Sequence, residues 1–294
     1  DSPLAGTEGD KVQSRVIRER LLREAEGNVA LRISESDEKD SMEVAGRGEL
    51  QLGILIETMR REGFELSVSR PKVLFQHDDS GDILEPIEEV VVDVDEEHAG
   101  IVVQKLAERK GEMVEMRPSG GGRVRLIFYA PTRGLIGYHG ELLTDTRGTA
   151  VMNRLFHAYG PHRGEVAARS NGVLISTDQG EAVAYAMWNL EDRGPMMIEP
   201  GWKVYRGMIV GEHTRDNDLE INVQKGKQLT NIRTHSKDEA VRLTPPIQMT
   251  LEKALAYIDE DELVEVTPQS IRLRKTVLDP NDRKRAVRAK ESAA

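Results

Sequence analysis

The sequence contains no cysteine, few aromatic residues and no long apolar run. The absence of cysteine excludes disulfides, thiolate zinc sites and cysteine nucleophiles, and it agrees with a reducing compartment. No run of about 18 apolar residues occurs, so the sequence predicts no transmembrane helix. With 294 residues, of which 38% are hydrophobic and 31% charged, the chain is expected to form two or three globular domains.

The sequence also lacks the motifs of common catalytic and metal sites. It has no G-x-x-x-x-G-K-[ST], H-E-x-x-H or G-x-S-x-G pattern. The glycine-rich stretch 118–123 joins two expected strands, which favours a hairpin turn over a phosphate cradle. His157 and His162 have no evident further ligands nearby. We therefore expect no catalytic residue, no metal site and no cofactor in this chain.

Hydrophobic periodicity predicts an α+β fold with two tandem ferredoxin-like (split βαβ) modules, followed by a β-rich C-terminal domain with one or two helices. Residues 1–76 read as helix, strand, strand, helix, strand, which is the ferredoxin-like order with its first strand incomplete. Residues 77–162 show the full β-α-β-β-α-β order. The chain starts without an initiator methionine, and we expect it to be a fragment whose missing strand lies mostly upstream of Asp1.

The expected C-terminal domain spans residues 163–294, where short β-branched stretches alternate with turns. One helix is expected after Thr250, which is a good N-cap residue, and a basic helix or tail after Asp279. Trp188 and Trp202 are expected to pack in the core of this domain or between its strands.

Positive charge is concentrated in one stretch of an acidic chain. The net charge of −10 argues against general binding to nucleic acid. Residues 222–243 nevertheless hold five Lys or Arg against two acids, and residues 224–238 show neither a helical nor a strand period. A long loop with cations, small polar side chains and a glycine suits contact with a phosphate backbone. The candidate RNA-binding residues of this basic loop are Lys225, Lys227, Asn231, Arg233, Lys237 and Arg242.

The basic loop contains no aromatic residue. Stacking on unpaired bases is therefore disfavoured, and recognition of the shape of folded RNA is favoured. A flexible, soluble connector is the alternative interpretation of the same composition.

A second group of cations lies near the C-terminus. Residues 271–294 hold eight Lys or Arg against three acids, first on an expected strand and then on an expected helix. A solvated terminal tail is the alternative for the helical part. The candidate RNA-binding residues here are Arg272, Arg274, Lys275, Arg283, Lys284 and Arg285.

The order of parts and several motifs resemble one protein family. The stretches "GRGELQLGILIETMRREGFE" and "EEHAGIVVQKLAERKGEM", with "FYAPTRGLIGYHGELLTDTRG", resemble domains III and V of the elongation-factor-G family. The stretches "PHRGE", "GMIVGEHTRDNDLEINV" and "KQLTNIR" narrow the resemblance to the C-terminal half of the BipA/TypA family of translational GTPases. The resemblance covers essentially all 294 residues.

This resemblance implies that the chain is the ribosome-docking half of a GTPase. Family members bind the ribosome at the factor site and are linked to large-subunit assembly and to cold and stress responses. The implied partners are the ribosome, 23S-type rRNA and the acceptor arm of A-site tRNA, and no membrane. The implied location is the cytoplasm, or an organellar stroma or matrix, and a monomeric fragment is expected. The family's GTPase domain, with its P-loop, GTP and Mg²⁺, is missing, so we expect no GTP hydrolysis by this chain.

Two other interpretations were considered. A ligand-sensing regulatory protein is the alternative, because paired ferredoxin-like domains also form small-molecule sites. It predicts an apolar pocket between the modules and no salt-dependent binding to RNA. An elongation-factor-G or ribosome-protection relative, acting by translocation or drug displacement, would require that family's domain IV between the modules, where only "VLFQHDDSGDILEP" occurs.

Overall fold

The computed structural model describes residues 2–36, 40–166, 169–226 and 242–293. The chain forms two compact units that do not follow each other simply along the sequence. The first unit combines residues 1–70 with residues 169–294, and the second unit contains residues 71–168. The second unit is therefore an insertion within the sequence of the first.

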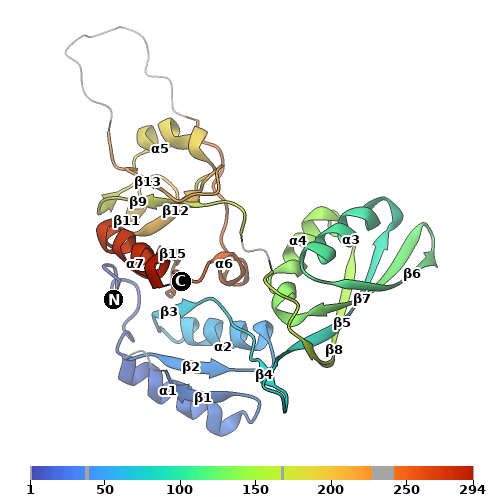
Figure 1. Ribbon diagram of the computed structural model, residues 1–294. Coiled ribbons are helices and arrows are strands. Elements are labelled where there is room, and N and C mark those ends of the chain that lie inside the picture. The colour runs from blue at the N-terminus through green and yellow to red at the C-terminus, as the bar shows by residue number, and fades with distance from the viewer. Residues whose placement is uncertain (1, 37–39, 167–168, 227–241, 294) are drawn as a thin grey trace. The chain divides into compact units, whose positions relative to one another are not determined.

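The N-terminal part of the first unit has the element order that its periodicity predicts (Figure 1). The bounds are α1 Ser14–Gly27, β1 Arg32–Glu35, β2 Met42–Ala45, α2 Glu49–Arg61 and β3 Leu66–Ser69. β1 and β2 form an antiparallel hairpin. Leu21, Leu55, Met59 and Phe64 are buried in a small core beneath the two helices.

The C-terminal part of the first unit is rich in short strands. Its elements are β9 Val173–Ser176, β10 Gly180–Glu181, α5 Ala184–Leu190, η3 Glu191–Arg193, β11 Lys203–Val204, β12 Met208–Glu212, β13 Leu219–Ile221, α6 Leu251–Tyr257, β14 Glu262–Val266, β15 Ile271–Lys275 and α7 Pro280–Ala293. The predicted cap of α6 is confirmed, because the Thr250 side chain accepts a hydrogen bond from the backbone N–H of Lys253 (3.3 Å).

The C-terminal part contains more helices than the one or two predicted from the sequence. The stretch "AVAYAMW" reads as a strand by its alternation, but most of it forms α5. Alanine and methionine have high helix propensity, and α5 buries Ala186 and Met187 against the domain. Among the described residues this part therefore has three α-helices, α5, α6 and α7.

The main sheet of the first unit joins the two distant parts of its sequence. Its strand order is β13-β9-β12-β15-β14-β3. β3 pairs antiparallel with β14, with Leu66 opposite Val266 and Ser69 opposite Leu263. The N-terminal segment adds a second tie, because Leu4 is buried in a core cluster formed otherwise by residues after 170. Residues 1–70 are thus part of the same folded body as the C-terminal residues.

The second unit is a four-stranded antiparallel sheet with two helices, extended by a short hairpin strand (Figure 1). Its elements are β4 Gln76–His77, β5 Ile83–Asp95, η1 Glu96–His98, α3 Ala99–Glu108, β6 Glu112–Gly120, β7 Arg123–Pro131, η2 Thr132–Leu135, α4 Tyr138–Asp145 and β8 Val151–Pro161. The ladders β8 to β5, β5 to β7 and β7 to β6 give the ferredoxin-like strand order. Val92, Leu106, Leu126 and Phe128 lie in its core. The predicted β-α-β-β-α-β order is confirmed here.

The described part of the chain has neither a membrane-spanning helix nor a cluster of metal ligands. None of the helices in these ranges is long and apolar enough to span a membrane. No group of three or more His, Asp or Glu side chains in the same ranges is placed to hold a metal ion.

Candidate nucleic-acid interface

The first end of the basic loop is anchored by a buried residue. After β13 the chain reaches Val223, which is fully buried. Its carbonyl accepts a hydrogen bond from the backbone N–H of Val183 (2.8 Å), just before α5. Lys225 follows two residues later and is exposed. A fixed backbone thus presents Lys225 to solvent at the start of the loop.

The second end of the basic loop returns to the same region. Leu243 packs against the core cluster that contains Val223. The backbone N–H of Thr244 donates to Oε1 of Glu191 (2.6 Å), directly after α5. Arg242, just before these anchors, is exposed. Exposed cations therefore flank the loop on both sides, and α5 lies between the residues that hold its two ends.

The other loop candidates, Lys227, Asn231, Arg233 and Lys237, lie outside the described residues. Their role in binding RNA stays a prediction from the sequence.

The cations of β15 do not form an exposed patch, which corrects the interpretation from sequence. Arg272, Arg274 and Lys275 are all nearly inaccessible, with at most 5% of their surface exposed. Arg272 pairs with Glu8 (2.6 Å) and Glu265 (3.1 Å), and Arg274 also pairs with Glu265 (3.1 Å). Their charges are neutralised inside the fold, and these three side chains are not available to RNA.

The charge of Lys275 is compensated by three acidic side chains. Its Nζ lies 2.7 Å from Asp218, 3.0 Å from Asp261 and 2.9 Å from Glu262. Burial acts to lower the pKa of Lys275, but the attraction of Glu262 and hydrogen bonds to Asp218 and Glu262 outweigh burial and raise it. Burial likewise acts to raise the pKa of Glu262, and ion pairing with Arg169 and Lys275 lowers it on balance. The group is a buried ionic network.

A signal for this network was present in the sequence. The stretch "DELVEV" precedes "IRLRK" by one turn, so an antiparallel hairpin places acids opposite bases. In the structure Glu262 is opposite Lys275 and Glu265 is opposite Arg272. Reading the two strands as a pair would have predicted ion pairs between them.

The helix α7 begins where its cap predicts. The Asp279 carboxylate accepts hydrogen bonds from the backbone N–H groups of Asn281 (2.8 Å) and Asp282 (3.3 Å), and Pro280 occupies the first helical position. These backbone hydrogen bonds hold the pKa of Asp279 below its usual value. The predicted helix start is confirmed.

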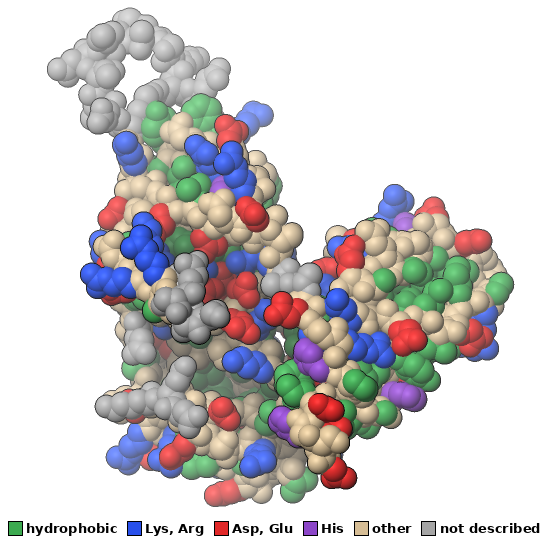
Figure 2. Space-filling model, in the orientation of Figure 1, with side chains coloured by type: hydrophobic (Ala, Val, Ile, Leu, Met, Phe, Trp, Pro, Cys, Tyr) green, Lys and Arg blue, Asp and Glu red, His purple; other side chains and the backbone are tan. Residues whose placement is uncertain are grey.

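The three predicted cations of α7 differ in their surroundings. Arg283 is largely buried, donates to the carbonyl of Leu278 (2.8 Å) and pairs with Glu220 (3.0 Å). Lys284 and Arg285 are exposed, and Arg285 pairs only with its helix neighbour Asp282 (3.1 Å). Figure 2 shows Lys and Arg side chains gathered over α7. Lys284 and Arg285 are therefore accessible to a ligand, whereas Arg283 mainly holds the helix in place.

An exposed aromatic residue on α5, the helix beside the two loop ends, was not predicted as a functional residue from the sequence. Trp188 is 50% exposed, and its ring centroid lies 6.4 Å from that of Tyr185 on the same face of α5. Trp202 is 37% exposed. The expectation of packing in the core or between strands was wrong for Trp188, because this residue lies on the helix α5 with half of its surface exposed.

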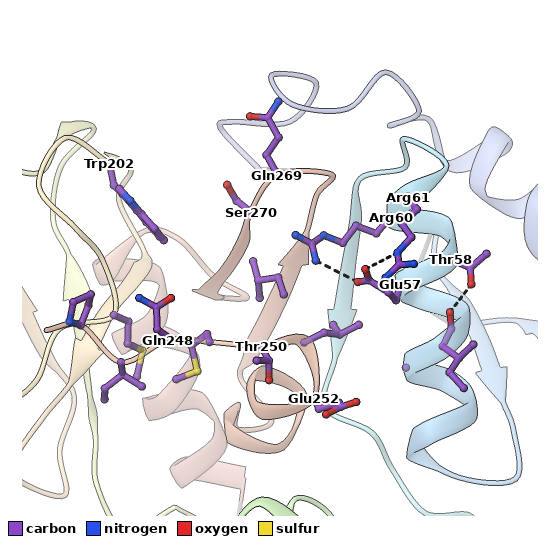
Figure 3. Close-up of a pocket in the computed structure, with 18 of the residues that line it drawn as sticks. Glu57, Thr58, Arg60, Arg61, Trp202, Gln248, Thr250, Glu252, Gln269 and Ser270 are labelled. Atoms are coloured by element: carbon purple, nitrogen blue, oxygen red, sulfur yellow. Dashed lines mark hydrogen bonds and ion pairs between the residues drawn. The ribbon is translucent and has the colours of Figure 1, made fainter.

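A groove of about 780 Å³ lies within the first unit, between α2 and residues 246–252 (Figure 3). Arg60 and Arg61 line it, but both pair with Glu57 (3.2 and 3.0 Å). Glu199 and Glu252 also line it. Its cations are neutralised and its further carboxylates repel phosphate, so this groove does not suit a nucleic-acid backbone.

Comparisons with known proteins agree with this set of domains. The family model for the elongation factor G C-terminus matches residues 82–170, and that for the TypA/BipA C-terminal domain matches residues 171–280. These domains define a translation-factor class of protein. The chain belongs to the BipA/TypA family and corresponds to the C-terminal region of its members.

Curated relatives named large ribosomal subunit assembly factor BipA extend the match to the whole chain. The protein of Escherichia coli K12 is 55% identical over 289 residues, which is 98% of this chain and 47% of the relative. Those of Haemophilus influenzae and Bacillus subtilis are 51% and 50% identical over 294 residues, all of this chain and 48% of each relative. The chain spans about half the length of these relatives and is homologous to their C-terminal half.

Proposed function

We propose that this chain is the ribosome-docking half of a BipA/TypA-like translational GTPase. It docks at the factor site and A-site region of the large subunit, with 23S-type rRNA and the acceptor arm of A-site tRNA as partners. Its role lies in large-subunit assembly and in cold or stress adaptation. The name of the relatives, large ribosomal subunit assembly factor BipA, supports the role in assembly.

One observation carries the proposal. Lys225 and Arg242 are exposed at the two anchored ends of the basic loop. The cations of β15, in contrast, form buried ion pairs with acidic side chains. Lys225, Arg242 and, on α7, Lys284 therefore present exposed positive charge on a protein with net charge −10. The net negative charge of the protein repels most polyanions, whereas cations on the loop can contact RNA phosphates, and the release of counterions from RNA favours these contacts.

The proposed organisation has three domains. Residues 1–76 form a domain III-like ferredoxin module that lacks its opening strand, residues 77–162 a domain V-like module, and residues 163–294 the BipA-type RNA-binding domain. Among the described strands β2 pairs only with β1, and β3 only with β14, which supports a missing strand in the first module. GTP and Mg²⁺ binding and GTP hydrolysis, which the resemblance implies for the parent protein, are proposed to lie outside this chain, which covers 47% of the relative.

Cosedimentation with large ribosomal subunits over a salt series tests the proposal. In the test variant Lys225, Lys227, Arg233 and Lys237 are changed to Ala. The slope of log affinity against log salt should flatten by roughly three, since each lost phosphate contact removes about 0.7 to 0.9.

The matched control removes four exposed cations elsewhere in the first unit, Arg15, Arg18, Arg23 and Lys253. The slope of log affinity against log salt should be the same for this control as for the unmodified chain. An equal change in both variants, or no change in the loop variant, would exclude the loop as the RNA contact.

A further inference from the structure

An exposed tryptophan beside the basic loop lacks an evident structural role. Half of the Trp188 surface is accessible, although indole is a large apolar group whose exposure to water is unfavourable. Tyr185 lies one helical turn earlier, and the two rings are tilted at 40° to each other rather than stacked. Together they leave aromatic surface open on α5.

The position of α5 relative to the loop is fixed by hydrogen bonds at both of its ends. Val183, just before the helix, donates to the carbonyl of Val223 (2.8 Å). Glu191, just after it, accepts from the backbone N–H of Thr244 (2.6 Å). The aromatic pair therefore lies on the element that adjoins both exits of the basic loop.

Cations accompany the aromatic pair. Lys225 and Arg242 are exposed at the loop ends, and Arg193 is exposed in η3, directly after α5. Of the two acids in η3, Glu191 accepts the hydrogen bond from Thr244 and Asp192 is exposed. On the face shown in Figure 2, apolar side chains lie among Lys and Arg side chains at the end of the first unit that carries α5. Aromatic rings next to uncompensated cations form the usual surface for an unpaired nucleotide, because the ring stacks on the base while the cations contact the phosphates.

We propose that Trp188 is a stacking platform for an unpaired base of the RNA that the basic loop contacts. This inference rests on the proposed function and refines it. The loop has no aromatic residue and by itself favours structured RNA. With Trp188 beside it, the surface binds a single-stranded nucleotide next to a structured region. A peptide ligand is less suited, because the flanking exposed cations favour an anionic partner.

Fluorescence can isolate this residue, because the chain contains only two tryptophans. In a Trp202→Phe variant Trp188 is the sole indole. Titration with single-stranded oligo(A) should quench its emission, and titration with a matched RNA duplex should quench it less. Quenching by a glutamate-rich peptide but not by oligo(A) would overturn the inference in favour of a protein partner.

Affinity measurements separate stacking from charge. Trp188→Ala should lower the affinity for oligo(A) about tenfold, in the range for loss of one stacked base, and should leave the salt slope unchanged. Trp188→Phe should keep most of the affinity. A Lys225→Ala, Arg242→Ala variant should instead flatten the slope by roughly 1.5.

The outcomes distinguish this inference from the proposed function. Salt-dependent RNA binding that is unaffected by Trp188→Ala would overturn the stacking role and leave the loop contact standing. Absence of RNA binding by the unmodified chain would overturn both. Far-UV circular dichroism and urea unfolding of Trp188→Ala should match those of the unmodified chain, because the side chain is half exposed.

Discussion

At the scale of single residues, the ion pairs of β15 stabilise the first unit. Glu262 receives two cations, Lys275 (2.9 Å) and Arg169 (2.9 Å), and its own side chain is completely buried. A buried pair of this kind adds little over apolar packing, but removing one partner leaves a charge without compensation in a region of low dielectric constant. The network therefore makes the fold sensitive to single substitutions.

Lys275→Met should destabilise the chain by about 3 kcal/mol, because it leaves Glu262 and Asp261 without their shared cation. Urea unfolding followed by tryptophan fluorescence measures this loss. The control Lys284→Met, on the exposed side of α7, should change stability by less than about 0.5 kcal/mol. Equal effects of the two substitutions would contradict a structural role for Lys275.

Single residues were the hardest level to predict from the sequence. Lys225 and Arg242 could be recognised by composition, and both are exposed. Arg272 and Arg274 have the same charge but are buried, because strand pairing places Glu265 next to them. Their environment depends on register and on a contact with Glu8, which is distant in sequence and has no local signal.

At the scale of elements, the N-terminal segment 2–12 ties the first part of the chain to the C-terminal sheet. Leu4 is buried in the core of that part. Glu8 accepts hydrogen bonds from Arg272 (2.6 Å), Ser270 (3.2 Å) and Thr267. Burial acts to raise the pKa of Glu8, but the hydrogen bonds from Thr267 and Arg272 outweigh it and lower the pKa.

A lowered pKa gives this segment an acid-sensitive attachment. The stabilisation from Glu8 is fully present above the pKa of the unfolded chain and is lost as pH falls through the lower folded value. At neutral pH Glu8→Gln should cost about 1 kcal/mol, allowing for the partial exposure of Glu8. The difference between variant and unmodified chain should shrink below about pH 4. Urea midpoints across pH measure it, and a difference that does not depend on pH would exclude the ionised carboxylate as its source.

Elements with a strong period were predicted well, and those with short or ambiguous patterns were not. α2 has apolar residues at helical spacing, and β5 is a long β-branched run. α5 has only seven residues, and its sequence alternates like a strand. Its helical state is decided by packing of Ala186 and Met187, which sequence pattern alone does not specify.

At the scale of the whole molecule, the two units have separate cores. The core of the second unit draws only on residues between 90 and 152, and the clusters of the first unit draw on residues before 70 and after 170. The sequence predicted successive domains, because periodicity reports local elements and not the pairing of β3 with β14, which are about 200 residues apart.

Excision of residues 71–168, with a Gly/Ser linker joining Arg70 to Arg169, should leave the first unit folded. Both tryptophans lie in this unit, so their emission reports its unfolding alone. The urea midpoint should stay close to that of the full chain, since no core residue of the first unit is removed. Loss of the cooperative transition would show that the second unit is required for folding of the first.

The pairing of β3 with β14 also has a consequence for cleavage of the backbone. If a protease cut the chain near residues 70 and 169, it would release the inserted unit as a separate piece. The two remaining polypeptides would stay associated without a covalent link, through the main-chain ladder between Leu66–Ser69 and Leu263–Val266 and through the side chains of Leu4 and Glu8. The same two segments, made separately, should reassemble when mixed.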